Sequence, residues 1–306
     1  MRIVSLLPSI TEIVCAIGKE SELVGRSHEC DYPESITSLP ACTTPKYQAD
    51  GTSYEIDQRI KATVQEGLSV YRVDAELLAS LQPDLILTQN HCEVCAASVN
   101  EVKQAVQESM GDEDVRIVSV APENLDEVFL SIQEIAEAVG VEEQGEALIK
   151  QMINKLNKTQ SKTAQLPSPD VVCLEWITPL MSAGNWFPEL VNIAGGNTLL
   201  GKPGEPSGWI EWEQVAEQDP DLLLISPCGY SLQKTAEEIN QLTSKPEFTN
   251  LQAVKKNRVY LMEGHHYFHR PGPRLVESTE ILAEIFHPGL FDATHRNSGW
   301  INYSEQ

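Results

Sequence analysis

An internal repeat constrains the fold of this chain more than any other feature of its sequence. The segment 74–87 aligns without a gap with the segment 211–224, at a constant offset of 137 residues. Each copy is typical of a short helix, a Pro-Asp turn and a buried strand. A shorter second match pairs residues 114–118 with residues 256–260. Two matches in the same order predict that the chain contains two equivalent α/β lobes.

Strand-like and helix-like segments alternate along both halves of the chain. Apolar runs of strand length occur at 2–7, 85–88, 116–120 and 171–174, and segments with helical periodicity separate them. Such alternation is typical of parallel sheets that are covered by helices. We therefore predict the α/β fold class, with two Rossmann-like lobes that are each built on a parallel sheet.

A single long helix is predicted between the lobes, where an apolar stripe runs through Leu148, Met152 and Leu156. At about 1.5 Å per residue this helix is roughly 30 Å long, which is enough to connect two lobes. The predicted division of the chain is an N-terminal lobe at 1–140, the connecting helix at 141–165, a C-terminal lobe at 166–291 and a loose, polar tail at 292–306.

The charge balance excludes several classes of partner. The chain has 45 acidic and 22 basic residues, which gives a formal net charge of -23. Because phosphate groups repel such a polyanion, we predict no nucleic-acid partner and no binding to anionic membranes. No apolar run reaches the length of about 18 residues that a membrane span needs, so no membrane span is predicted.

The N-terminus shows no secretory signal. Met1 and Arg2 lead directly into the apolar run 3–7, which is too short for the hydrophobic region of a signal peptide. We therefore predict a cytoplasmic protein, or a periplasmic or extracytoplasmic one if the sequence is that of a trimmed chain. In the cytoplasm its seven cysteines are expected to be reduced.

Histidines and cysteines gather directly after the predicted strands. Ligands of open parallel sheets bind beyond the carboxyl ends of the strands, so we expect these residues to meet in one cleft between the lobes. Imidazole and thiolate groups bind zinc and other transition metals. The candidate metal ligands are His28, Cys30, His91, Cys92, Cys95, Cys228, His265 and His269.

The strongest local motif is His91 followed by Cys92 and Cys95. Two thiolates separated by two residues can hold one side of a tetrahedral zinc ion, or they can act as a redox pair. Cysteines with this spacing also occur as small buried apolar residues. The sequence leaves these three interpretations open, together with contact between these residues and a bound organic ligand.

Aromatic and polar side chains in the same loops form a second set of candidates. Trp186 and Trp209 each follow small residues, and we expect these loops to present the indoles to a flat, largely apolar ligand. Arg270 suits carboxylates or phosphate on such a ligand. The candidate ligand contacts are Tyr32, Gln89, Glu175, Trp176, Asn185, Trp186, Trp209, Tyr230, His266, Tyr267 and Arg270.

Several common catalytic motifs are absent from the sequence. The chain has no GxxxxGK[ST], no strand-linked GxGxxG, no HExxH and no GxSxG. These motifs therefore assign no catalytic residues, and the expectation that the protein is not an enzyme comes with the family resemblance described next.

Five segments together resemble a known family: 4–18, 23–26, 30–33, 82–87 and 257–260. In this order and spacing they are similar to the class III substrate-binding proteins of ABC importers, and especially to the cobalamin-binding subgroup. The resemblance implies two α/β lobes joined by one rigid backbone helix. It also implies that a siderophore, haem or corrinoid binds in the cleft between the lobes, and that an acidic residue on each lobe docks on a permease. Glu213 matches the docking position of the second lobe.

The leading hypothesis is a non-catalytic binding protein for a corrinoid such as cobalamin, or for a related metal chelate. An ABC permease is its expected partner if the protein is exported. One alternative is direct binding of a zinc ion by Cys92 and Cys95 with His28, Cys30 or Cys228. The other alternative is a thiol-dependent enzyme that processes a corrinoid.

Overall fold

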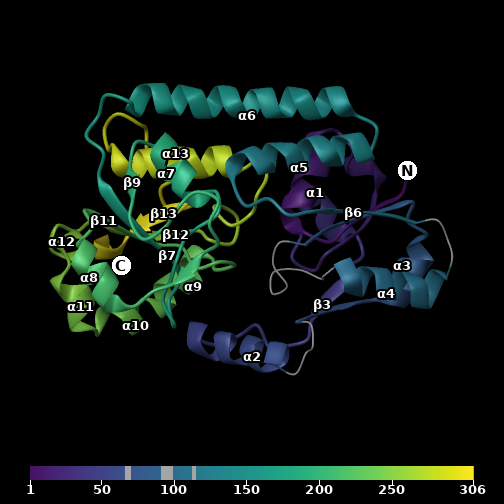
Figure 1. Ribbon diagram of the computed structural model, residues 1–306, viewed down its shortest axis with the longest axis horizontal. Coiled ribbons are helices and arrows are strands. Elements are labelled where there is room, and N and C mark those ends of the chain that lie inside the picture. The colour runs from purple at the N-terminus through teal and green to yellow at the C-terminus, as the bar shows by residue number, and fades with distance from the viewer. Residues whose placement is uncertain (66–69, 91–98, 112–114, 306) are drawn as a thin grey trace. The chain divides into compact units, whose positions relative to one another are not determined.

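The computed structural model describes residues 1–65, 70–90, 99–111 and 115–305 (Figure 1). The chain forms two compact units. The first unit comprises residues 1–51, 55–122 and 126–151, and the second comprises residues 52–54, 123–125 and 152–306. Both units contain parallel strands and helices, so the predicted α/β class is confirmed.

The first unit is built on a parallel sheet. Its strands lie in the order β2 (Leu23–Arg26), β1 (Ile3–Ser5), β5 (Leu85–Gln89) and β6 (Arg116–Val120). Strands β3 (Thr43–Pro45) and β4 (Tyr71–Val73) come between β2 and β5 in the chain and form a separate, short antiparallel pair. The helical elements are α1 (Pro8–Ala16), η1 (Glu20–Glu22), η2 (Glu34–Ser38), α2 (Ser53–Gln65), α3 (Ala75–Leu81), α4 (Val99–Met110) and α5 (Leu125–Ala138).

The second unit has a mixed sheet with a parallel centre. Its central strands β7 (Asp170–Trp176), β11 (Leu222–Ile225) and β12 (Val259–Met262) are parallel. Its edges are antiparallel: β8 (Met181–Ser182) and β10 (Gly208–Trp209) on one side, β13 (Trp300–Asn302) on the other. The short strand β9 (Asn197–Thr198) pairs in parallel with β7.

Helices surround this mixed sheet, and α7 (Phe187–Ile193) packs against α13 (Leu275–Phe286) within the unit. The remaining helical elements are α8 (Trp212–Gln218), α9 (Leu232–Glu238), α10 (Asn240–Thr243), α11 (Pro246–Asn250), α12 (Gln252–Lys255) and η3 (Tyr303–Glu305). The core of the unit is apolar and continuous, since Val172, Leu223 and Leu261 from the three central strands are buried in one cluster.

The internal repeat is visible in the backbone. Helix α3 ends at Gln82, which has a φ of 45°, and strand β5 follows; helix α8 ends at Asp219, which has a φ of 40°, and strand β11 follows. These two left-handed residues are 137 positions apart, as the alignment requires. The prediction of a helix, a turn and a buried strand in each copy is confirmed.

Helix α6 (Glu142–Thr163) has 22 residues and passes from one unit to the other. Residues up to Gln151 belong to the first unit, and residues from Met152 belong to the second. Its buried positions include Met152, Leu156 and Thr163, which share one face because they recur at helical spacing. Within the part of the chain that the structure describes, no helix is both long and apolar enough to cross a bilayer.

The expectation of a loose tail at 292–306 is wrong. Residues 300–302 form β13, which pairs with β12, and the indole of Trp300 is buried. Glu284, which is buried on α13, accepts hydrogen bonds from Trp300 Nε1 at 2.9 Å and from the Thr294 amide at 3.0 Å. The polar composition hid this arrangement, because the anchoring carboxylate comes from a different element.

Candidate functional site

A hydrogen-bonded network lies at the carboxyl ends of the central strands of the second unit. Glu175 is near the end of β7, Ser226 follows β11, and His269 follows β12. Glu175 Oε2 accepts a hydrogen bond from Ser207 Oγ at 2.6 Å and lies 3.9 Å from His269 Nδ1. On the other side of the ring, His269 Nε2 lies 2.6 Å from the Ser226 carbonyl oxygen. We call these four residues the Glu175–His269 network.

This network resembles a serine–histidine–carboxylate arrangement, but its hydrogen bonds do not suit nucleophilic chemistry. Ser226 is 0% exposed, so a substrate carbonyl cannot reach its hydroxyl. A carbonyl oxygen can only accept, so the 2.6 Å contact makes His269 Nε2 a donor to Ser226 O. A ring nitrogen that carries a proton cannot act as the base for the serine hydroxyl. The network therefore holds the loop after β12 in place, and His269 is held inside it.

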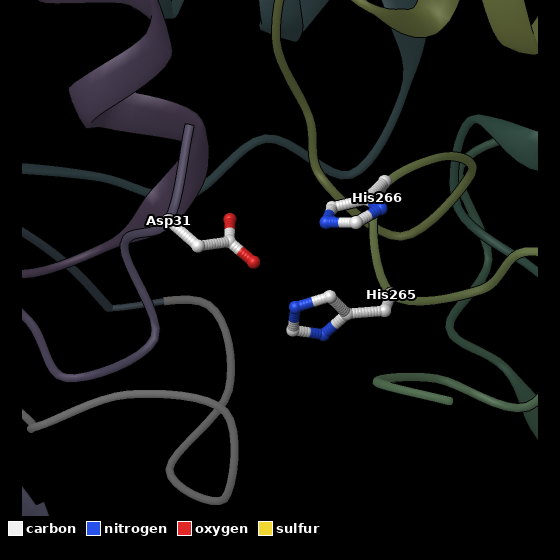
Figure 2. Close-up of side chains that lie close together, drawn as sticks. All are labelled: Asp31, His265 and His266. Carbon is white, nitrogen blue, oxygen red and sulfur yellow. The ribbon is translucent and has the colours of Figure 1, made fainter. Parts of the chain in front are cut away.

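The loop after β12 presents two further imidazoles. His265 and His266 have ring centroids 4.7 Å apart at an interplanar angle of 62° (Figure 2). Buried Glu263 accepts from the backbone amides of His265 at 3.2 Å and Leu232 at 2.8 Å, which fixes the start of this loop. The side chain of His266 is 43% exposed and therefore accessible.

Arg270 lies at the end of the same loop. Its guanidinium is buried, and Nη2 lies 3.3 Å from His265 Nε2. Arg274, also buried, has its guanidinium carbon 5.3 Å from the centroid of the Tyr267 ring. Two buried guanidiniums therefore lie at this loop, which also contains the buried carboxylate of Glu263. Asp31, which Figure 2 also labels, belongs to the first unit.

The tryptophans of the second unit differ from one another in exposure. Trp209 on β10 is 57% exposed, as a ligand-contacting indole requires. The expectation that Trp186 presents its indole to solvent is wrong, because Trp186 is 6% exposed and its Nε1 donates to the Phe268 carbonyl at 2.7 Å. The small residues before Trp186 serve close packing: a Cβ at Gly184 would lie 2.4 Å from the Glu205 carbonyl oxygen.

Several other candidates lie near the end of β7. The rings of Trp176 and Tyr230 meet edge to face with centroids 5.3 Å apart, and Lys234 Nζ lies 4.3 Å above the Tyr230 ring. Trp176 Nε1 and Asn185 Oδ1 are buried polar atoms without a hydrogen-bond partner among the described residues. Buried polar atoms are usually hydrogen-bonded in a folded protein, so these two atoms are candidate contacts for a bound ligand. Cys228 in the next loop is half-buried.

The first unit brings His28 to the end of β2. His28 Nδ1 lies 2.8 Å from Thr43 Oγ1, and the same oxygen accepts from the His28 amide at 3.1 Å. The ring packs against Tyr71 with centroids 5.5 Å apart. Burial, together with the nearby charge of Arg26, lowers the pKa of His28 below that of a free histidine. The imidazole is therefore neutral near pH 7.

The other first-unit candidates have different environments. Cys30 is buried, and its sulfur accepts a hydrogen bond from Thr11 Oγ1 at 3.1 Å and faces the Ser5 carbonyl at 3.9 Å. Gln89 is also buried, whereas Tyr32 is exposed. His91, Cys92 and Cys95 lie outside the described residues, so the metal and redox interpretations of this motif stay predictions.

The described cysteines away from the strand ends are unreactive thiols. Burial raises the pKa of Cys15 to about 12 and that of Cys42 to about 12. Burial also raises the pKa of Cys173 well above its usual value. These groups stay protonated at neutral pH and do not offer thiolates to a metal.

Glu213 is exposed in the first turn of α8. The helix begins with a capping box, in which Glu211 and Gln214 each bond to the backbone of the other. Trp212 and Val215 bury the opposite face of the helix. This arrangement holds Glu213 toward solvent, where a partner protein can reach it.

Sequence reasoning missed the residues that position the candidates. Ser207, Ser226, Thr43 and Glu263 hold the histidines and Glu175 through hydrogen bonds. Ser207, Ser226 and Thr43 are remote in sequence from the residues that they contact. Glu263 is close in sequence to His265 but is an ordinary polar residue next to a loop. No local motif marks them, so only the tertiary structure identifies them.

Comparison with known proteins gives consistent results. Residues 3–265 match the family described as periplasmic binding protein. An uncharacterized ABC transporter substrate-binding lipoprotein of Bacillus subtilis is 24% identical, over 95% of this chain and 81% of that protein. A vitamin B12-binding protein of Vibrio vulnificus is 22% identical, over 93% of this chain and 89% of that protein. The crystal structure of a periplasmic heme binding protein from Pseudomonas aeruginosa superimposes with a TM-score of 0.71 and 22% identity, over 94% of this chain and 93% of that one.

Proposed function

Because this chain belongs to the periplasmic binding protein family, we propose that it is a non-catalytic binding protein for a metal chelate of the tetrapyrrole type. The observation that carries the proposal is the family match over residues 3–265. Relatives of similar length support the ligand class, since one is named for vitamin B12 and a structural neighbour for heme. A corrinoid such as cobalamin is the first candidate, and haem is the second.

The chemistry of the second unit supports this class of ligand. Corrinoids and haems share a broad, flat ring system with a central metal and polar groups at the rim. The exposed indole of Trp209 suits the flat face. The imidazole of His266 suits the metal, and the buried guanidinium of Arg270 suits a carboxylate or phosphate at the rim.

We further propose that the partner is an ABC permease, with exposed Glu213 as a docking residue. Carboxylates on the surface of a binding protein can pair with basic side chains on a transporter. The cytoplasmic location predicted from the N-terminus stays a prediction. Fractionation of native cells with an antibody to this protein tests the location directly, since an importer receptor belongs outside the inner membrane.

Titration of the purified protein with aquacobalamin, cyanocobalamin and ferric hemin tests the proposed function. We expect one equivalent of at least one chelate to quench tryptophan fluorescence with a Kd in the micromolar range or below. Replacing Trp209 by alanine should weaken binding about fivefold, because the variant loses a stacking contact worth roughly 1 kcal/mol. Leu290→Ala is the matched control, because Leu290 is 50% exposed in the same unit.

Parallel experiments with zinc and with added thiol test the two alternatives. Stoichiometric binding of zinc without binding of any chelate would contradict the proposal and would favour a direct metal site. Conversion of cyanocobalamin or an alkylcobalamin by the protein with added thiol would favour the enzyme hypothesis. Both alternatives depend on Cys92 and Cys95, so the Cys92→Ser, Cys95→Ser double variant should keep chelate binding if our proposal is correct.

A further inference from the structure

The aromatic ring of Tyr267, in the loop after β12, is in contact with the C-terminal segment (residues 292–305). The ring of His295 from this segment meets the Tyr267 ring nearly at a right angle, with centroids 6.3 Å apart and an interplanar angle of 82°. The guanidinium carbon of Arg274 lies 5.3 Å from the centroid of the same ring. The side chain of Tyr267 is half-buried, so part of it stays accessible. The orientation of this candidate ligand contact therefore depends on a residue of the C-terminal segment.

Buried Glu284 on α13 fixes His295 in turn. His295 Nδ1 lies 2.8 Å from Glu284 Oε1, and the backbone amide of His295 donates to Glu284 Oε2 at 3.2 Å. A carboxylate only accepts hydrogen bonds, so Nδ1 of His295 carries a proton and donates it. Because Glu284 is 4% exposed, water does not compete for these bonds. One carboxylate thus holds both the backbone and the ring of His295.

The backbone of the loop that carries Tyr267 is held on both sides of this residue. Before it, the Glu263 amide donates to the Gly299 carbonyl of the C-terminal segment at 2.9 Å. That segment packs closely on α13, since a Cβ at Gly299 would lie 2.6 Å from Ile281 Cδ1. After Tyr267, the Phe268 amide donates to Ser278 Oγ on α13 at 3.0 Å. The loop backbone therefore does not depend on the side chain of His295, whereas the ring of Tyr267 does.

We propose that His295 is a positioning residue for ligand binding: it orients the ring of Tyr267, and Tyr267 contacts the bound chelate. This inference rests on the proposed function and adds a residue of the C-terminal segment to it. An aromatic ring that is oriented before the ligand arrives loses less conformational freedom on binding, and this raises the affinity. His295 acts through Tyr267 and need not touch the ligand. Both residues belong to the second unit.

Titration of four variants with aquacobalamin and with ferric hemin tests this inference. His295→Asn keeps a donor for Glu284 but removes the ring beside Tyr267, so its affinity for the chelate that the wild type binds should fall about fivefold. Tyr267→Ala should weaken binding at least as much. The double variant should bind as Tyr267→Ala does, because His295 acts only through Tyr267. His295→Phe keeps an aromatic ring and loses the bond to Glu284, so it should unfold at lower urea concentration and still bind the chelate as the wild type does.

Thr294→Val is the matched control. It removes a different hydrogen bond to the same carboxylate, from Thr294 Oγ1 to Glu284 Oε1 at 2.7 Å, and leaves the ring of His295 in place. It should lower the stability without changing the affinity. If Thr294→Val or His295→Phe binds as weakly as His295→Asn, if the losses in the double variant add, or if Tyr267→Ala binds normally, the inference is wrong and the proposed function stands. If the wild type binds neither probe, the proposed function fails and the inference fails with it.

Discussion

The two copies of the repeat share a backbone but differ in the residues that stabilise it. In the first copy, the side chain of Asp74 caps α3 by accepting from the Leu77 amide at 3.0 Å. In the second, a capping box of Glu211 and Gln214 does the same for α8. Both helices end in a left-handed residue, and a Pro-Asp pair follows each time. The duplicated pattern therefore specifies the scaffold, and different side chains satisfy the same backbone groups.

The loops beyond the repeat differ more strongly than the repeat itself. In the first unit His28 lies between the Thr43 hydroxyl and the Glu29 carboxylate, whereas in the second unit His269 lies between the Ser226 carbonyl and the Glu175 carboxylate. The second unit also gains β13 and the C-terminal segment that Glu284 anchors. The comparison teaches that the scaffold is duplicated while the chemistry of each unit is its own. The following predictions test this comparison, beginning with the largest expected effect.

The first prediction compares the buried residue of each repeated helix. Leu78 on α3 and Val215 on α8 occupy equivalent positions, and both are fully buried. Leu78→Ala should lower the free energy of unfolding by about 2 to 5 kcal/mol, because it removes apolar atoms and leaves a cavity. Val215→Ala removes fewer atoms and should cost about half as much. Urea denaturation measures both, and a larger loss in Val215→Ala would show that the two helices are not equivalent.

The second prediction concerns Glu284, which anchors the segment that distinguishes the second unit. Its carboxylate accepts from Trp300 Nε1 at 2.9 Å, from Thr294 Oγ1 at 2.7 Å and from His295 Nδ1 at 2.8 Å. Glu284→Gln should lower the free energy of unfolding by about 2 kcal/mol, because hydrogen bonds to a charged group are lost. Limited proteolysis should then cut within 292–305. Glu280→Gln on the same helix is the control and should leave this segment protected.

The contribution of Glu284 to the free energy of unfolding should depend on pH. Burial raises the pKa of this carboxyl, but hydrogen bonds from Trp300, Thr294 and His295 outweigh burial and hold the pKa below its usual value. A lowered folded-state pKa stabilises the protein above the unfolded-state pKa of about 4.3, and this stabilisation disappears as the pH falls below it. The difference between wild type and Glu284→Gln should therefore shrink between pH 6 and pH 3. A constant difference would contradict this assignment.

The third prediction uses the two aspartates of the Pro-Asp turns. Asp84 accepts from the Arg2 amide at 2.6 Å, and Asp221 accepts from the Asp170 amide at 3.2 Å. Replacing either by alanine should cost about 1 kcal/mol. We expect similar losses, because the shorter bond of Asp84 lies at a more exposed position. Thermal denaturation of the two variants side by side checks this, and a loss confined to one of them would separate the two turns.

The smallest effect is expected at the left-handed residues Gln82 and Asp219. Glycine adopts a positive φ without the steric cost of a Cβ, so Gln82→Gly should stabilise the protein by about 0.5 kcal/mol. Asp219→Gly should gain little, because Asp219 Oδ1 also accepts from the Gln252 amide at 2.8 Å and that bond is lost. Differential scanning calorimetry resolves the two variants. Destabilisation by Gln82→Gly would show that its side chain has a role beyond the turn.

Features that depend on local pattern were predictable from the sequence. The repeat of 74–87 in 211–224 gave the helix, turn and strand of both units, because apolar periodicity and the Pro-Asp turn are local signals. The long helix near 141–165 was predictable for the same reason, and α6 occupies 142–163.

Features that depend on partners from distant segments were not predictable. The indole of Trp186 can be buried because its N–H donates a hydrogen bond to the carbonyl of Phe268, which is 82 residues away in the sequence. The tail is ordered because Glu284 lies on another helix. For the candidate site, the sequence predicted only that residues directly after the strands contribute to it. The orientations of the His28 and His269 rings depend on Thr43 and Ser226, which no motif marks.

Gel filtration of the wild-type protein after mixing with excess aquacobalamin or ferric hemin tests the central claim most directly. The account predicts that one equivalent of at least one chelate elutes with the protein peak, as measured by its visible absorption against the protein concentration. If the peak carries no chelate while the protein remains folded by circular dichroism, the claim of tetrapyrrole binding is contradicted.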